Sequence, residues 1–174
     1  VEDLLRRMSV EEKVGQMMGV WETRGDIQTP AGAFSAERAG KAYPDGLGQI
    51  SRPGDWRGVD AKANPAVADG IKTARQAADY INAAQKWAVE KTRLGVPLLM
   101  HEEALHGFVA RDATSFPQAI GLASTWDPDL VTRVFSVAAR EMRARGVHLA
   151  LAPVVDVARD PRWGRIEETY GEHP

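Results

Sequence analysis

Apolar residues along the chain fall into two patterns: longer segments with helical spacing, and short runs of consecutive apolar positions. The segment from Ala74 to Lys91 has Ala, Ile, Trp and Val at helical spacing, which predicts an amphipathic helix. The segment "WDPDLVTRVFSVAAREMRARG" predicts a second helix, with Asp127 as N-cap, Pro128 at the first helical position and Gly146 as terminator. Short apolar runs precede each of these two segments or follow it.

The first 44 positions give weaker signals. Residues 1–18 predict a helix, a break and a second helix, because Ser9 followed by Glu12 fits a capping box. The residues from Gly19 to Pro44 show little periodicity and several glycines, which predicts a long loop. We expect the two short helices to be buried through their apolar side chains, namely Leu4, Leu5, Met8, Val14, Met17 and Met18.

Three short apolar runs, "DGLGQI", "GVPLLM" and "VHLALAPVVDV", predict strands buried on both faces. Strands that alternate with helices indicate a parallel sheet, either open or closed into a barrel. In both arrangements ligands bind beyond the carboxyl ends of the strands. Polar residues that directly follow the apolar runs are therefore the candidates for a functional site.

Composition narrows the class of protein. The 174 residues are 44% hydrophobic and 26% charged with a net charge of −2, which is typical of a soluble globular domain. The near-neutral charge disfavours nucleic acid and anionic membranes as partners and leaves small neutral ligands open. Cysteine is absent. The sequence thus predicts neither disulfides nor thiolate metal ligands, and it leaves the periplasm, the exterior and the cytoplasm open as compartments.

The stretch "HEEALHG" follows "GVPLLM" directly and contains two histidines and two adjacent glutamates within seven residues. Because strand side chains alternate between faces, Glu102 and Glu103 are not expected to face the same pocket. The alternative is that these glutamates and histidines have no functional role and only form hydrogen bonds with nearby backbone groups. A metal site from His101, Glu103 and His106 matches no zinc signature, so no metal is predicted. Adjacent carboxylates also suit glycosidase acid/base chemistry poorly, because that chemistry uses carboxyls on separate elements.

The loop "ARDPRWGR" follows the last apolar run and carries Arg159, Arg162 and Arg165 beside Trp163. One interpretation is a salt-bridged loop that closes one end of the sheet. The other is a sugar-binding loop, because an arginine donates two parallel hydrogen bonds to vicinal hydroxyls and an aromatic face packs against sugar C–H groups. The residues alone leave both interpretations open.

Four segments carry a resemblance to a known family, and they follow one another in this order: "VEDLLRRMSVEEKVGQMM", "GVPLLMHEEALHG", "ATSFPQAIGLASTWDPDL" and "REMRARGVHLALAPVVDVARDPRWGRIEETYGE". In wording and order they closely resemble the amino-terminal domain of glycoside hydrolase family 3. This family comprises retaining exo-β-glycosidases, including β-glucosidases and β-xylosidases. The resemblance implies a (β/α)8 TIM-type barrel, of which residues 1–174 would supply the first three strand-helix units and stop before the barrel closes. It implies a small carbohydrate substrate and no cofactor, and it leaves the oligomeric state open.

The resemblance also assigns roles by position. Glu103 stands where many members have an aspartate that binds the non-reducing-end hydroxyls of the sugar, and Arg165 matches a sugar-binding arginine of the same subsite. The remaining matches are expected to support the site: Asp156, Asp160, Trp163 and His106. The family's Lys-His pair, its aspartate nucleophile and its acid/base residue correspond to later positions, so we expect this chain alone to be inactive.

The resemblance leaves the substrate between xylose and glucose. Glu103 has one methylene more than aspartate, which crowds the region of a glucoside's hydroxymethyl arm and slightly favours a β-xylosidase over a β-glucosidase. A non-catalytic carbohydrate-binding homologue would keep Glu103 and Arg165 and lack the nucleophile. A phosphate-binding α/β enzyme would need a Gly-rich turn between strand and helix, and neither "GLGQIS" nor "EALHGF" has that spacing.

Overall fold

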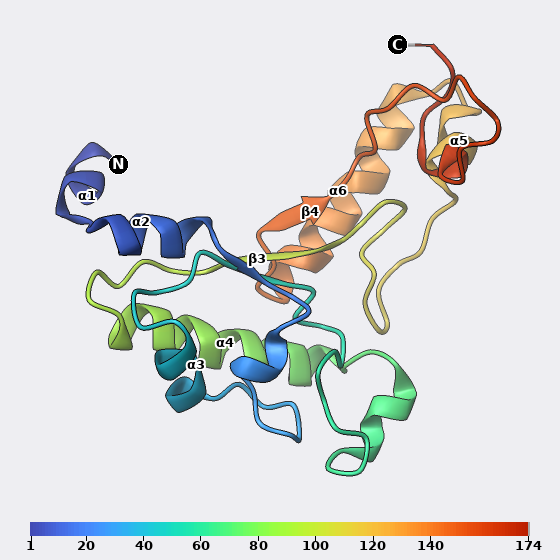
Figure 1. The fold of residues 1–174 in the computed structure, drawn as a ribbon. Helices are drawn as coiled ribbons and strands as arrows, with labels where there is room; N and C mark the ends of the chain where they lie inside the picture. The colour runs from blue at the N-terminus through green and yellow to red at the C-terminus, as the bar shows by residue number, and fades with distance from the viewer. Residues whose placement is uncertain (174) are drawn as a thin grey trace.

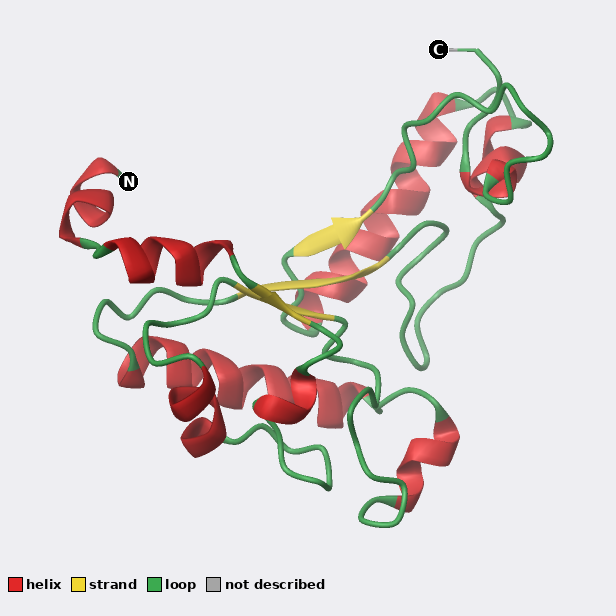
Figure 2. Cartoon of the chain, in the orientation of Figure 1, coloured by secondary structure: helices red, strands yellow, loops and turns green. Residues whose placement is uncertain are grey.

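The structure is a computed structural model that describes residues 1–173, and a parallel sheet lies at its centre (Figure 2). The sheet has four strands in the order β1-β2-β3-β4, all parallel. Their bounds are Gly19–Val20, Gln49–Ser51, Leu99–Glu103 and Leu149–Leu151. Spatial order therefore follows chain order, as in a sheet built from successive strand-helix units. The α/β class predicted from the apolar runs is confirmed.

The two long helices are the ones that the sequence predicted. Helix α4, Ala74–Lys91, starts at a capping box between Thr73 and Gln76 and covers one face of the sheet (Figure 1). Helix α6, Pro128–Ala144, starts at the Asp127 side chain, which accepts a hydrogen bond of 2.8 Å from the amide of Leu130. These caps satisfy amides that have no partner within the helix. A shorter helix, α5, spans Ala119–Ala123.

The core lies between the sheet and α4. Val20, Ile50 and Met100 are paired across β1, β2 and β3, and each is at most 1% exposed. Their side chains pack in one hydrophobic cluster with residues of α4, among them Ile81, Ala84 and Trp87. Alternation along β3 places Glu102 on the same face as Met100, and His101 and Glu103 on the other face.

The other face of the sheet is partly open in residues 1–173, so the prediction of strands buried on both faces is wrong for these positions. Leu99, Leu149 and Leu151 are 41%, 39% and 37% exposed. Continuous apolar runs are typical of strands covered on both faces, but within residues 1–173 these leucines remain partly exposed. The apolar runs therefore include residues on a face of the sheet that the described residues do not cover.

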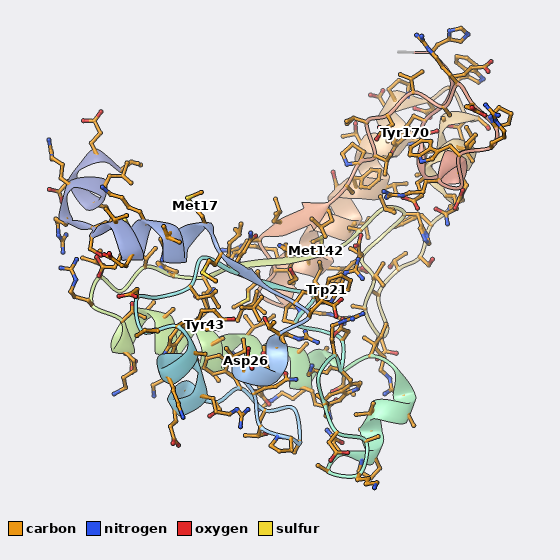
Figure 3. All side chains as sticks on the ribbon, viewed as in Figure 1. Met17, Trp21, Asp26, Tyr43, Met142 and Tyr170 are labelled. Atoms are coloured by element: carbon orange, nitrogen blue, oxygen red, sulfur yellow. The ribbon has the colours of Figure 1, made fainter. Side chains whose placement is uncertain are left out.

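The amino-terminal helices are α1, Glu2–Arg7, and α2, Val10–Met17. The predicted Ser9–Glu12 capping box is present, but the predicted apolar burial is wrong: Met17, labelled in Figure 3, is 81% exposed. Helix α2 packs through its polar side instead. Glu12 accepts a hydrogen bond of 2.7 Å from Arg93, and Gly15 lies so close that an added Cβ would be 2.8 Å from the Gly46 carbonyl oxygen.

The segment predicted as a long loop contains ordered elements. Beyond β1 it forms a 3-10 turn, η1 at Arg24–Asp26, and helix α3 at Ala36–Ala42, which begins at the Ser35 side chain. Two further 3-10 turns are η2, Pro65–Asp69, and η3, Ile166–Glu168. A two-residue strand has no periodicity to detect and exists through its pairing with β2. Within residues 1–173 no helix is long and apolar enough to cross a membrane.

Candidate functional site

The carboxyl edge of the sheet brings together side chains from three neighbouring strands. Trp21 follows β1, Arg52 follows β2 and Glu103 ends β3. The carboxyl ends of parallel strands lie at the same edge, so these positions converge although 82 positions separate Trp21 from Glu103 (103 − 21). Trp21 is labelled in Figure 3, close to the central strands.

Glu103 and Arg52 form an ion pair at this edge. Nη2 of Arg52 donates to Oε1 of Glu103, and the two side chains are 32% and 24% exposed. The Arg52 guanidinium also lies 4.3 Å from the centroid of the Trp21 ring, a cation–π contact. The backbone of Arg52 is left-handed, with φ of 46°, and its amide donates to the His101 carbonyl at 2.8 Å. A non-glycine residue in this region indicates a turn whose surroundings over-determine its conformation.

Glu102 points to the opposite side of β3, into the layer between sheet and helices. It is 4% exposed and accepts a hydrogen bond of 2.7 Å from the amide of Gly54. Burial raises the pKa of Glu102 to about 7, against the lowering effects of the Gly54 amide and of nearby cations. A Cβ added at Gly54 would lie 2.9 Å from the same carboxylate oxygen, so a larger residue here would have to displace the Glu102 carboxylate.

Two buried cations bind the backbone of the turn that carries Arg52. Arg24 is fully buried and donates to the carbonyls of Ser51 at 3.4 Å and Arg57 at 3.3 Å, and also to the carboxylate of Asp55. Nζ of Lys72 donates to the Pro53 carbonyl at 3.1 Å. Charge-assisted hydrogen bonds from the buried side chains of Arg24 and Lys72 therefore fix the turn after β2.

Lys72 is held in an unusual environment for a lysine. It is 2% exposed, and its ammonium lies 4.5 Å from the ring centroid of Trp56 and 5.1 Å from that of Tyr80. Burial, together with the positive charge of Arg24, lowers the pKa of Lys72 to about 7. Burial also raises the pKa of Tyr80 to about 12. These side chains are buried behind the sheet, so we assign them to the support of the turn.

The loop from Asp156 to Glu168 carries the other predicted sugar-binding residue. Arg165 is exposed and its Nε donates to Glu168 at 3.0 Å. The contact with Glu168 raises the pKa of Arg165, and the charges of Asp156 and Glu103 add to this effect. Arg165 and Glu103 are thus in each other's electrostatic field, although they come from separate strand ends.

The remaining predicted residues have contacts that shape loops. Asp160 accepts hydrogen bonds from Arg162 at 2.9 Å and 2.6 Å, and its carbonyl accepts from the amide of Trp163 at 3.0 Å. The ring Nδ1 of His106 lies 2.9 Å from the Phe116 carbonyl oxygen, and the Phe116 amide donates to the His106 carbonyl at 2.8 Å. His106 therefore joins the loop after β3 to the segment that leads to α5.

The structure adds residues that sequence reasoning did not single out. Arg52 stands in "GQISRPGD", where a charge two residues after the predicted strand was the available signal. Trp21 gave no signal because β1 was not recognised. His101, considered as a metal ligand, instead contacts Gln49, with Nδ1 3.1 Å from Oε1. In the described part of the chain no group of three or more acidic or histidine side chains is placed to hold a metal ion.

A groove of about 790 Å³ lies elsewhere, between α5, α6 and the segment that follows η3. Apolar side chains dominate its lining, including Ile120, Leu122, Trp126, Val131 and Tyr170. Neither Glu103 nor Arg165 is among its lining residues. Polar and charged side chains from three strand ends are gathered at the carboxyl edge of the sheet, and we therefore place the candidate site there.

The fold and this edge define an α/β protein with a polar site beyond the ends of parallel strands. The model of the glycosyl hydrolase family 3 N-terminal domain matches residues 9–174. The chain therefore belongs to this family, and its sheet is part of a TIM-type barrel fold, as the sequence predicted.

Relatives with curated names include both expected activities. Beta-glucosidase C of Emericella nidulans is 34% identical over 99% of this chain and 26% of its own length. A putative beta-xylosidase of Formosa agariphila is 32% identical over 99% of this chain and 21% of its own length. Among solved structures, a β-glucosidase of Erythrobacter marinus superposes with a TM-score of 0.71 at 30% identity, covering 98% of this chain and 20% of that one. The chain spans about a quarter or less of these relatives.

Proposed function

We propose that the protein containing this chain is a retaining, exo-acting β-glycosidase that removes terminal β-linked xylose or glucose. We propose further that residues 1–174 form the first part of its barrel and contribute to sugar binding. The family match over residues 9–174 carries the proposal. The names of the relatives, a β-glucosidase and a putative β-xylosidase, support the substrate class.

The site chemistry fits a sugar-binding role. Glu103 offers carboxylate oxygens that accept hydrogen bonds from hydroxyls, and Arg165 offers N–H groups that donate to hydroxyl oxygens. The ion pair with Arg52 and the electrostatic field between Glu103 and Arg165 support a shared site at the carboxyl edge. Asp156, Asp160, Trp163 and His106 would shape the loops around it.

The two carboxyls of a retaining mechanism are assigned to residues outside this chain. Such enzymes hold a nucleophile and an acid/base residue about 5 Å apart across the scissile bond. Glu102 is bonded to the Gly54 amide on the helix side of β3, which leaves it unsuited to either role. By resemblance to the family, the nucleophile is an aspartate later in the protein, which would form a glycosyl-enzyme ester and be regenerated by water.

The proposal is tested by turnover of aryl β-glycosides. The complete enzyme is expected to hydrolyse aryl β-xylosides and aryl β-glucosides with retention of configuration, followed by NMR of the released sugar. The purified chain of residues 1–174, assayed in parallel, is expected to show no turnover because it lacks both catalytic carboxyls. Turnover by this chain, proportional to its concentration, would contradict the assignment of the nucleophile to a later residue.

We propose β-xylosides as the preferred substrates. Compared with aspartate, Glu103 extends its carboxylate by one carbon–carbon bond, roughly 1.5 Å, toward the region of a glucoside's hydroxymethyl arm. A one-methylene difference in a pocket discriminates by about 1 to 3 kcal/mol. The expected outcome is a preference rather than exclusion, and β-glucosidase is the alternative that relatives such as beta-glucosidase C support.

Substitution of Glu103→Asp is expected to move substrate choice toward glucosides. We expect the ratio of kcat/KM for aryl xyloside over aryl glucoside to fall by about 5- to 160-fold, the equivalent of 1 to 3 kcal/mol. The control is Glu167→Asp, which shortens an exposed glutamate in η3 and should leave the ratio unchanged. A wild type that prefers the glucoside, or a Glu103→Asp variant with an unchanged ratio, would favour the β-glucosidase alternative.

A further inference from the structure

We propose that Arg52 is a positioning residue of the sugar site, which acts by fixing the carboxylate of Glu103 toward a non-reducing-end hydroxyl. This inference rests on the proposed function and deepens it. It concerns a residue from a strand other than the two that carry Glu103 and Arg165. Three observations support it: the pairing of Arg52, the way its turn is anchored, and the contrast with the neighbouring Arg57.

The ion pair fixes the Glu103 side chain. A glutamate has three rotatable side-chain bonds, so a carboxylate that is partly exposed, as Glu103 is, samples several directions unless another group holds it. Nη2 of Arg52 donates to Oε1 of Glu103, which leaves Oε2 without a hydrogen bond from residues 1–173. A single oxygen held in one direction favours one hydroxyl of the ligand over the others, which is how hydrogen bonding gives specificity.

Arg52 is itself held on three sides. Its guanidinium stacks 4.3 Å from the Trp21 ring centroid, its amide donates to the His101 carbonyl at 2.8 Å, and its own carbonyl accepts from the buried Arg24. The left-handed φ of 46° is a costly conformation for a residue other than glycine. Buried groups beneath the turn therefore hold Arg52 at the end of β2 beside Glu103.

Arg57 provides a matched comparison within the same turn region. Its guanidinium lies 4.2 Å from the same Trp21 ring, and its Nη1 contacts Glu22 at 2.9 Å. The Glu22 side chain is 68% exposed, whereas the Glu103 side chain is 24% exposed. Arg52 and Arg57 thus share one aromatic partner and differ in the carboxylate that each holds.

The experiment uses the complete enzyme with Arg52→Asn, Arg52→Lys and Arg57→Asn. Asparagine is suited to the left-handed turn, so Arg52→Asn removes the guanidinium while the backbone keeps its conformation. Each variant is assayed with an aryl β-xyloside and with its analogue lacking the 4-hydroxyl, the hydroxyl at the non-reducing end. The readout is the ratio of kcat/KM for the two substrates, and thermal unfolding shows that each variant is folded.

We expect the wild type to prefer the hydroxylated xyloside by about 10- to 100-fold, the range for a hydrogen bond to a charged group. Arg52→Asn should reduce this ratio to within about threefold of unity. Arg52→Lys should keep most of the ratio, because a single donor pairs with Glu103 and a lysine ammonium still supplies one. Arg57→Asn should keep the wild-type ratio. These outcomes together support the inference.

Two results would overturn it. One is an Arg52→Asn variant that lowers kcat/KM for both substrates equally and keeps the ratio, which would make Arg52 a structural residue of the turn. The other is an Arg57→Asn variant that reduces the ratio as much as Arg52→Asn. A folded wild type that hydrolyses neither xylosides nor glucosides would overturn the proposed function itself, and this result is distinct from both.

Discussion

Replacement of Arg24→Met in the complete enzyme is expected to destabilise the domain that contains this chain by about 3 to 5 kcal/mol, the usual cost of breaking a buried ionic network. Arg24 is 0% exposed and donates to the carbonyls of Ser51, Asp55 and Arg57 and to the Asp55 carboxylate. Methionine fills a similar volume and donates nothing, so these carbonyls and the partly buried Asp55 carboxylate lose their partner. The relief of the repulsion between Arg24 and Lys72 offsets part of this loss.

Calorimetry measures this effect as a lower midpoint of the transition of that domain. A loss of 3 to 5 kcal/mol corresponds to about 6 to 20 °C for a domain of this size. Arg38→Met is the control, because Arg38 is exposed and donates one hydrogen bond, of 2.9 Å, to the Gly25 carbonyl. We expect the control to shift the midpoint by less than about 4 °C, the equivalent of one kcal/mol. An Arg24→Met variant as stable as the control would mean that the turn after β2 does not depend on Arg24.

Replacement of Arg165→Lys in the complete enzyme is expected to lower kcat/KM by about 10- to 100-fold, the cost of one lost hydrogen bond between a charged group and a hydroxyl. The guanidinium donates in a planar fork, and an ammonium provides one point charge in its place. In this structure two nitrogens of the Arg165 fork, Nε and Nη2, both contact Glu168.

Arg162→Lys is the matched control for this prediction, because Arg162 lies in the same loop, its side chain is 89% exposed, and it is paired with Asp160. Steady-state kinetics on an aryl β-xyloside should show less than a twofold change for the control. If Arg165→Lys also stays within about twofold of the wild type, under about 0.5 kcal/mol, Arg165 only supports the loop.

The sequence by itself determined the elements whose signals are local. Helix α4 was predicted from apolar spacing and helix α6 from its start and stop residues, and both signals act within one segment. The caps that the structure shows, at Thr73 and Asp127, also involve neighbours in the chain. The parallel α/β class followed from the alternation of such helices with apolar runs. The match over residues 9–174 confirmed the resemblance to the family, which rested on the residues of several motifs and their order along the chain.

The elements that sequence reasoning missed depend on partners far away in the chain. Strand β1 has two residues and is stabilised by its pairing with β2, and the apolar side of α2 is exposed because Glu12 and Gly15 face the body of the molecule. No local pattern encodes which side of a short helix finds a partner, since this depends on the surfaces that other segments present.

The residues of the candidate site also fall into those that the sequence predicted and those that only the tertiary structure revealed. The sequence placed Glu103 and Arg165 after two apolar runs, and alternation along a strand separated Glu103 from Glu102. Only the tertiary structure joined Arg52 to Glu103, stacked it on Trp21 and placed Arg24 and Lys72 beneath the same turn. Parallel pairing brings strand ends together across long stretches of sequence, so contacts between these ends follow from topology and register, which single-segment patterns do not contain.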